Sequence, residues 1–258
     1  PPMRNSHLTL RIFIWSLTLG MVACTDKTET LSFPPISDYA PLTIGKYITY
    51  RVDSLVFTNF GRNTEIHKYQ MKHVVDALFT DGMGRPSYRI IRYISDSTAS
   101  TPWQPDGTYY ITSVGDQLEV VEDNLRVIKL HQPLRAEYIW KGNRFLPTDP
   151  YEPLYNFSND DAMIDWEFRI DGDPTTFSHR GITYNNVLTV DAVDESFNIP
   201  ITTPTVYASR SRSVERFSKG IGLIYREHEL WEYQPNTGGS GGPYKIGFGI
   251  TQWMVDHN

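Results

Sequence analysis

The stretch that decides the fold is TYYITSVGDQLEVVEDNLRVIKLH, which extends from Thr108 to His131. It contains three runs, at 108–114, 117–122 and 125–131, that are rich in Val, Ile, Tyr and Thr, residues that favour β-strands. Gly115-Asp116 separates the first two runs, and Asp and Asn separate the last two, which is typical of tight turns. The stretch therefore predicts consecutive antiparallel strands joined as hairpins.

The same pattern continues on both sides of this stretch. In 164–170, apolar residues alternate with charged ones, as expected of a strand with one buried and one wet face. No run of ten or more residues carries the apolar stripe of a helix, and at most a turn or two is expected around 158–163. The predicted fold class is therefore all-β: a single strongly curved antiparallel sheet or partly open barrel, with little helix. Further strands are predicted at 46–52, 71–79, 88–95, 187–193, 210–217, 222–233 and 246–255.

Composition and charge exclude some classes of protein. The chain has 258 residues, of which 40% are hydrophobic and 13% aromatic, so it can bury a core. Its formal net charge is -6 and it shows no clustered basic stretch, which argues against a nucleic-acid partner. A single cysteine excludes an internal disulfide and a thiolate metal cluster. The length suits one all-β domain.

The N-terminal residues predict a bacterial lipoprotein signal. Arg4 and Arg11 precede an uncharged run over 12–23, which is shorter than the roughly 20 residues that span a bilayer but fits the apolar region of a signal peptide. Met21 to Cys24 resembles a lipobox, in which a cysteine is diacylated, for example with palmitate, and becomes the new N-terminus. We expect residues 1–23 to be removed. The alternative is an ordinary secretory signal, with Cys24 a buried thiol.

These features divide the chain into three parts. The acyl chains on Cys24 are the predicted membrane contact, since several of them anchor a protein without a basic patch. Residues 24–40 are polar and then contain prolines, which predicts a flexible tether. A single β domain is expected over 41–258.

Several blocks resemble a family of uncharacterised Bacteroidota-type lipoproteins. YAPLTIGKYITY at 39–50 with VDSL at 52–55 is similar to the family's YxPLxxGxYWxYxVDS opening, although Ile48 stands where Trp is usual. The resemblance implies an outer-membrane lipoprotein, on the periplasmic face or the cell surface, and implies no enzymatic activity. KGIGLIYRE at 219–227 is also similar to half-barrel, lipid-carrier-like proteins. Other similar blocks are 122–130, 140–143, 247–250 and the closing Asp256-His257-Asn258.

No catalytic, metal or cofactor site is predicted. The histidines are not spaced as a metal-binding pair, and no Gly-x-Ser-x-Gly motif, P-loop or free cysteine nucleophile is present. Solvated turns are the favoured interpretation of one acidic set that could offer oxygen atoms to Ca²⁺, because its spacing is not that of an EF-hand. This set comprises Asn159, Asp160, Asp161, Asp165 and Asp171-Gly172-Asp173.

Two smaller patterns concern the surface. Asp53-Ser54-Leu55 and Asp96-Ser97-Thr98 match a tripeptide used for O-glycosylation in that bacterial group, which makes Ser54 and Ser97 candidate acceptors. Arg210, Arg212 and Arg216 alternate with Glu215 around Val214, and this predicts one solvated strand face.

The tryptophans either pack in the sheet core or line a concave ligand surface. The leading hypothesis is a lipid-anchored cell-envelope protein that acts as a non-enzymatic binding or envelope-assembly module. The alternative is a surface hydrolase or carbohydrate-binding accessory lipoprotein that uses a carboxylate such as Asp165 or Glu167. Two carboxylates about 5 to 10 Å apart in a cleft would favour the enzyme, and an apolar cavity without titratable groups would favour carriage. The candidate ligand contacts are Trp103, Trp140, Trp166, Trp231 and Trp253.

Overall fold

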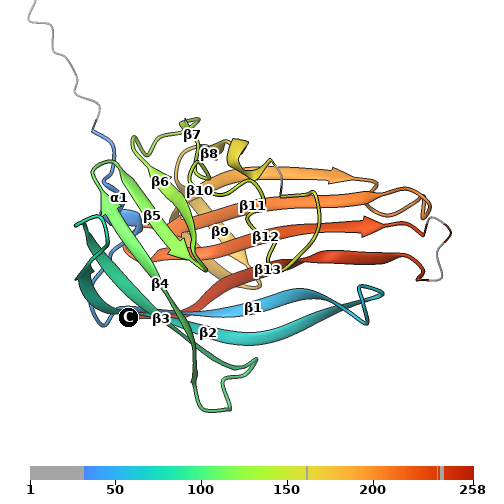
Figure 1. Ribbon diagram of the computed structural model, residues 1–258. Helices are drawn as coiled ribbons and strands as arrows, with labels where there is room; N and C mark the ends of the chain where they lie inside the picture. Colours follow the sequence, from blue (N-terminus) through green and yellow to red (C-terminus); the bar gives the residue numbers. More distant parts are fainter. Residues whose placement is uncertain (1–31, 161, 237, 239–240) are drawn as a thin grey trace, which may run out of the picture. The chain divides into compact units, whose positions relative to one another are not determined.

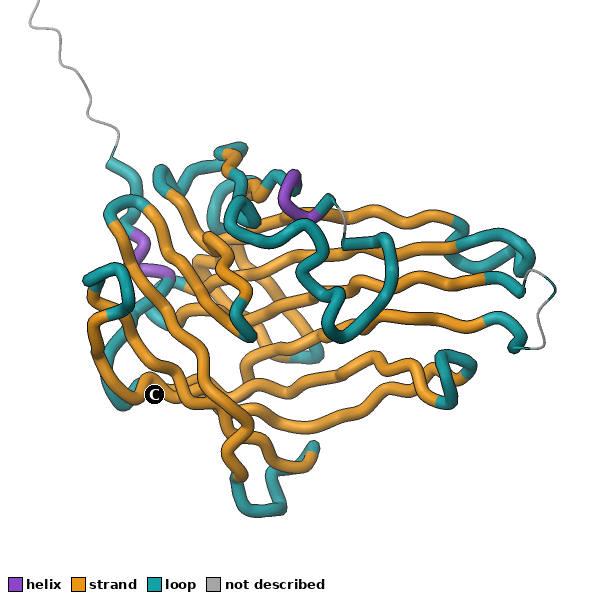
Figure 2. The backbone as a smooth tube through the Cα atoms, in the orientation of Figure 1, coloured by secondary structure: helices purple, strands orange, loops and turns teal. Residues whose placement is uncertain are grey.

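The computed structural model describes residues 32–160, 162–236, 238 and 241–258. A compact unit, here called the β domain, extends from Phe33 to Asn258, and Cys24 with the predicted signal peptide lies outside the described residues. Strands dominate the β domain (Figure 1, Figure 2). The elements are α1 (Ile36–Tyr39), β1 (Tyr47–Thr58), β2 (Asn63–Thr80), β3 (Pro86–Asp96), β4 (Gln104–Val114), β5 (Gln117–Glu122), β6 (Leu125–His131), β7 (Ile139–Trp140), the 3₁₀ turn η1 (Met163–Asp165), β8 (Phe168–Ile170), β9 (Thr175–His179), β10 (Ile182–Phe197), β11 (Ala208–Ser218), β12 (Gly222–Gln234) and β13 (Tyr244–His257).

All the described strands belong to one antiparallel sheet. Its order is β6-β5-β4-β3-β2-β1-β13-β12-β11-β10-β8-β7, and β9 pairs with β10 beside this path. Strands β1 to β6 form a meander in chain order, as the hairpins of 108–131 predict. The last strand, β13, lies between β1 and β12 and so joins the two halves of the chain. The predicted all-β fold, a strongly curved sheet or partly open barrel, is confirmed.

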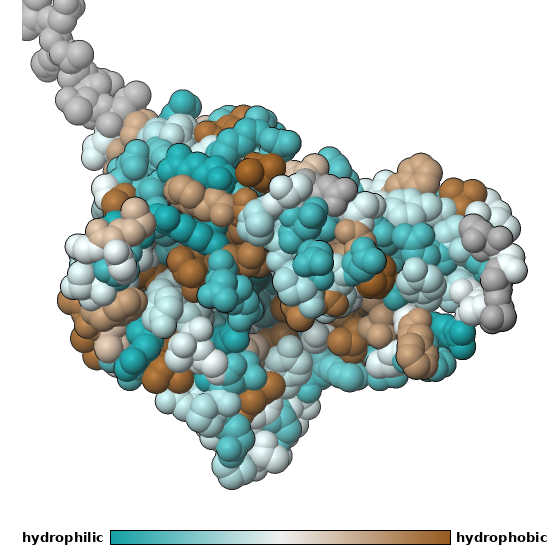
Figure 3. Space-filling model, viewed as in Figure 1, coloured by the Kyte–Doolittle hydropathy of each residue, from teal (hydrophilic) through white to brown (hydrophobic). Residues whose placement is uncertain are grey.

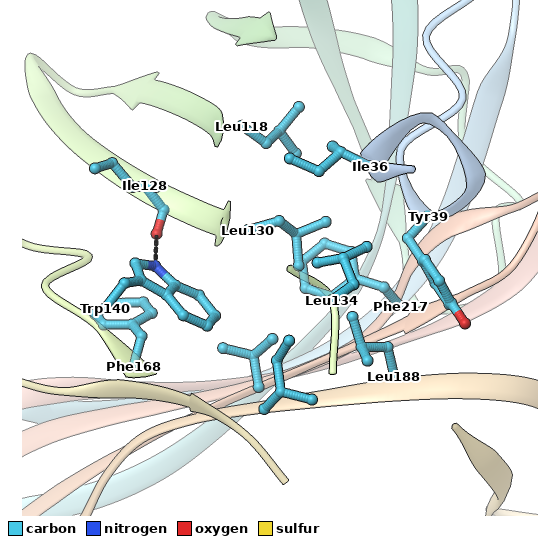
Figure 4. Close-up of a cluster of buried hydrophobic side chains, with 12 residues drawn as sticks. Ile36, Tyr39, Leu118, Ile128, Leu130, Leu134, Trp140, Phe168, Leu188 and Phe217 are labelled. Carbon is cyan, nitrogen blue, oxygen red and sulfur yellow. Dashed lines mark hydrogen bonds between the residues drawn. The ribbon is translucent and has the colours of Figure 1, made fainter. Parts of the chain in front are cut away.

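The sheet nearly closes because the neighbourhoods of its two end strands, β6 and β7, meet at Ile128. The backbone N–H of Ile128 donates to the Gly142 carbonyl at 2.8 Å, and the Ile128 carbonyl accepts from Trp140 Nε1 at 2.9 Å (Figure 4). No strand ladder pairs β6 with β7 in the part of the chain that the structure describes. The seam of the barrel is therefore bridged at Ile128 rather than sealed along its length.

Residues 33–40 belong to the β domain and not to the predicted tether. Ile36 and Tyr39, on the short helix α1, are only 4% and 2% exposed and pack in the core cluster shown in Figure 4. The Asp38 carbonyl accepts from the Gly220 backbone N–H at 2.6 Å, and the Asp38 carboxylate pairs with Lys219 at 3.0 Å. The domain starts at Phe33 rather than 41 because α1 supplies apolar surface to the core. The tether over 24–31 stays a prediction.

The connection between β7 and β8 crosses the inner face of β11 and β12. Asn159 donates its amide to the Arg210 carbonyl at 2.8 Å, and the Ser158 hydroxyl donates to the buried Glu232 carboxylate at 2.8 Å. The buried Asp160 carboxylate accepts from the Tyr151 backbone N–H at 2.9 Å. The members Asn159 and Asp160 of the acidic set thus hold this connection in place. No group of three or more metal-ligating side chains occurs among the described residues.

The predicted strand over 164–170 is wrong for its first half. Met163–Asp165 is a 3₁₀ turn, and only Phe168–Ile170 pairs as a strand. The Met163 carbonyl accepts both the Trp166 backbone N–H, at 3.2 Å, and the Asn143 side-chain amide, at 2.9 Å. These local bonds replace the strand ladder that the alternation predicts.

Candidate ligand cavity

A cavity of about 170 Å³ lies on the inner side of the curved sheet of the β domain. Its wall is made by inward-facing residues of β1–β6 and β11–β13 and by residues 39–42, which comprise the last residue of α1 and the three that follow it. Strand β2 illustrates the pattern, because Tyr69, Met71, His73 and Val75, at alternate positions, all line the cavity. On the face seen in Figure 3, the surface is hollowed near its centre and apolar residues gather around the hollow. Most of the wall is apolar.

Five charged side chains meet on this wall, and we call them the charged cluster. Arg226 is central: its Nη1 lies 3.6 Å from Glu122 Oε2, and its Nε lies 3.4 Å from Glu215 Oε1. Lys129 Nζ donates to Glu215 Oε1 at 2.6 Å, and Arg92 Nη1 donates to Glu122 Oε1. Each carboxylate therefore contacts two cations, which offsets the cost of burying its charge.

The members of the charged cluster differ in the direction in which their pKa values are shifted. Burial acts to raise the pKa of Glu122, but the charges of Arg226 and Arg92 outweigh it and leave that pKa lowered. Burial lowers the pKa of Lys129, and Glu215 offsets this only in part. Burial also opposes the charge of Arg226, yet Glu215 and Glu122 leave its pKa raised. Glu122 is therefore a carboxylate, not a proton donor, at neutral pH.

Neutral polar groups lie beside the charged cluster. His73 Nδ1 is 3.0 Å from the Tyr109 hydroxyl, and burial lowers the pKa of His73 to about 4, so the ring is uncharged at pH 7. The Nε2 atom of His73 is buried and has no hydrogen-bond partner among the described residues. The Tyr50 hydroxyl donates to the Leu223 carbonyl at 2.8 Å, and burial raises the pKa of both tyrosines. A polar ligand atom would give His73 Nε2 a partner that the protein does not supply.

The cavity combines features of the two alternatives considered from the sequence. The wall is apolar but not free of titratable groups, and Glu122 and Glu215 both contact the same guanidinium. A glycosidase pair needs one carboxylic acid with a raised pKa to protonate the leaving group, and the pKa of Glu122 is lowered. Asp165 and Glu167, the carboxylates considered from the sequence, are exposed and do not line the cavity.

The five candidate tryptophans are dispersed over the β domain, and none of them lines the cavity. Trp140 lies at the seam and Trp166 lies 6.4 Å from His228, ring to ring. The Trp231 ring meets the Phe57 ring edge to face, with 6.0 Å between the ring centroids. The remaining two tryptophans lie beside cations: the Trp103 ring is 4.9 Å from Lys72 Nζ, and the Trp253 ring is 4.7 Å from the Arg180 guanidinium. Contact of any of the five tryptophans with a ligand stays a prediction.

The two glycosylation candidates differ in their surroundings. Ser54 is inside β1, paired with His67 of β2 and Ile250 of β13. Ser97 lies in the turn after β3, where hydrogen bonds from Ser100 and Thr98 lower the pKa of Asp96. A modifying enzyme reaches a turn more easily than a central strand. Glycosylation of either serine stays a prediction.

The predicted solvated face on β11 is wrong for Glu215. This carboxylate is 5% exposed and faces the cavity, whereas Arg212 lies on the other face and pairs with Asp194 at 3.1 Å. Arg216 is also drawn away from solvent, since its guanidinium lies 4.3 Å from the Phe177 ring. Side chains alternate between the two faces of a strand, so Glu215 lies on the face opposite to that of Arg212 and Arg216. This alternation was the signal in the sequence that could have identified Glu215 as a cavity residue.

The comparisons with known proteins do not name a family. No family model matches this chain, and no curated protein matches it. A crystal structure described as an outer membrane lipoprotein-sorting protein domain from Vibrio parahaemolyticus matches with 11% sequence identity and a TM-score of 0.19, over 83% of this chain and 85% of that chain. A TM-score this low does not establish a shared fold, and membership of the Bacteroidota-type lipoprotein family stays a prediction. No helix in the described ranges is long and apolar enough to cross a bilayer.

Proposed function

We propose that the β domain is a non-enzymatic binding module that takes a small, largely apolar molecule into its cavity. The observation that carries the proposal is the cavity itself, about 170 Å³ in volume and walled mainly by apolar side chains. An engineered apolar cavity of about 150 Å³ in another protein is large enough to bind benzene. A concave apolar site with a few converging polar groups is the usual form of a small-molecule site.

We also propose that this module works at the outer membrane, anchored through acyl chains on Cys24. The support is the sequence of the N-terminus: a basic start, an apolar run and the lipobox-like Met21 to Cys24. An anchored module with its own cavity could hold an apolar molecule at the envelope without releasing it to bulk water.

Calorimetric titration with octan-1-ol, a neutral apolar probe, tests the cavity proposal. Val120 lines the cavity, whereas Val121 is the next residue of β5 and does not. We expect Val120→Phe to fill the cavity and weaken octanol binding at least about tenfold, and Val121→Phe to bind like the parent. Equal binding by the two variants, or a parent that binds no probe with an apolar chain of this length, would overturn the proposal.

A further inference from the structure

The cavity wall has an excess of positive charge, although the chain as a whole is negative. Four cations line it, Lys46, Arg92, Lys129 and Arg226, against the two carboxylates Glu122 and Glu215. The formal balance of the lining is therefore 4 - 2 = +2, whereas the whole chain carries -6. Charge excess of one sign in a buried site disfavours the empty state and favours a ligand of the opposite sign.

The protein supplies only some of the hydrogen-bond partners that the polar groups of the cavity wall need. Arg226 contacts its two carboxylates at 3.6 and 3.4 Å, longer than the roughly 2.7 to 2.9 Å of a charge-assisted hydrogen bond. Arg92 Nε is buried with no hydrogen-bond partner among the described residues, and the outlying Asp106 carboxylate is 3.9 Å from it. His73 Nε2 is likewise buried without a partner. Arg92 Nε and His73 Nε2 thus remain for a ligand, beside the loosely contacted guanidinium of Arg226.

We propose that the ligand is a small amphipathic monoanion, a carboxylate on an apolar body of roughly eight carbons, whose carboxylate binds Arg226 and Lys129. The inference rests on the proposed function, because it names the ligand class of the same cavity. The apolar body lies against the aliphatic wall that includes Val75, Ile90 and Val120. A guanidinium donates two parallel N–H groups to a carboxylate, which fits the loosely held Arg226.

Other charge states of the ligand fit the cavity less well. A neutral alcohol of the same length buries the same apolar body but leaves the excess positive charge uncompensated. An ammonium would add a further positive charge beside Lys129 and Arg226. A small anion without an apolar body would leave the aliphatic wall without contacts.

Calorimetric titration of the purified protein with octanoate, octan-1-ol, octylammonium and acetate tests the inference. We expect octanoate to bind about tenfold or more tightly than octan-1-ol, and octylammonium and acetate to bind most weakly. Octan-1-ol or octylammonium binding as tightly as octanoate would overturn the anion inference and leave the proposed function standing. Acetate binding as tightly as octanoate would overturn the inference that the ligand carries an apolar body. No binding of any probe would overturn the proposed function itself.

Two variants with opposite charge effects sharpen the test. Lys129→Met removes one cation, and we expect it to weaken octanoate binding about tenfold. Glu122→Gln keeps the side-chain shape and removes one carboxylate, so it should tighten octanoate binding several-fold. Octan-1-ol binding should change little in both, which shows that the cavity is intact. A role for cavity charge would be contradicted if a variant changed the affinities for octanoate and octan-1-ol equally. It would also be contradicted if the two variants changed the affinity for octanoate in the same direction.

Discussion

At the scale of single residues, Gly142 shows how little space the seam allows. A Cβ atom at this position would lie 2.5 Å from the Phe168 ring, and Phe168 packs in turn against Trp140 at 5.8 Å between ring centroids. The Gly142 carbonyl also accepts the bond from Ile128 that bridges β6 to the β7 end of the sheet. Glycine here is required by close packing rather than by a positive φ.

Gly142→Ala should therefore loosen the seam. We expect the free energy of unfolding to fall by about 1–3 kcal/mol, because the added methyl must displace a ring in the core. Gly82→Ala is the matched control, since a Cβ at Gly82 meets nothing within 4 Å. Urea denaturation measures both changes. If the two variants are equally stable, the seam is not packed as described.

His73 should make stability depend on pH. Burial lowers its pKa in the folded protein from 6.5 to about 4, so the unfolded chain binds the proton first as pH falls. The contribution of His73 is complete above pH 6.5 and is lost as pH falls towards 4, by up to about 3 kcal/mol. The pKa of the buried His228 is also lowered, which acts in the same direction.

The difference between the parent and His73→Gln isolates this residue from other acid-titrating groups. We expect the variant to lose less stability than the parent between pH 6.5 and 4, as measured by denaturation at a series of pH values. Parallel pH profiles would show that His73 is protonated as readily in the folded state as in the unfolded chain.

At the scale of elements, β13 is the strand that holds the sheet together. It pairs with β1 on one side and β12 on the other, so both halves of the sheet depend on it. Its end is also fastened, because Asn258 accepts from the Tyr47 backbone N–H at 2.7 Å and donates to the Gly45 carbonyl at 3.2 Å. The expectation that the final Asp256-His257-Asn258 belongs to the last strand is confirmed for Asp256 and His257 but not for Asn258, because β13 ends at His257.

Deletion of residues 246–258 should abolish cooperative folding. The loss leaves the facing backbone groups of β1 and β12 unpaired and opens the core between them. Deletion of residues 25–30 is the control and should leave thermal stability nearly unchanged. Circular dichroism during heating compares them. A cooperative melt of the first deletion near the parent temperature would mean that β13 is dispensable.

At the scale of the whole molecule, we expect the proposed anchor and the β domain to be separable. The compact unit begins at Phe33, nine residues beyond Cys24 in the chain. We expect Cys24→Ala to move the protein from the membrane fraction to the soluble fraction with the β domain still folded, because acyl chains supply the anchoring. Fractionation followed by circular dichroism checks this. Unchanged membrane fractionation would contradict the lipoprotein assignment.

The sequence by itself determined the all-β class and most strands. These follow from local preferences, since Val, Ile, Tyr and Thr suit strands and Gly, Asp and Asn suit turns. Runs of this kind, such as 108–114 and 125–131, keep their structure wherever the sheet places them. Where local bonds compete, as at Met163, the alternation fails.

The tertiary structure alone decided the closure, the start of the domain and the cavity. Lys129 and Glu215 are 86 residues apart in the chain and meet only because the curved sheet brings β6 opposite β11. A charged residue on a strand has the same local preference whether it faces water or a cavity, so the sequence pattern cannot distinguish the two. The reason is that burial of a charge depends on distant partners, which only the complete sheet supplies.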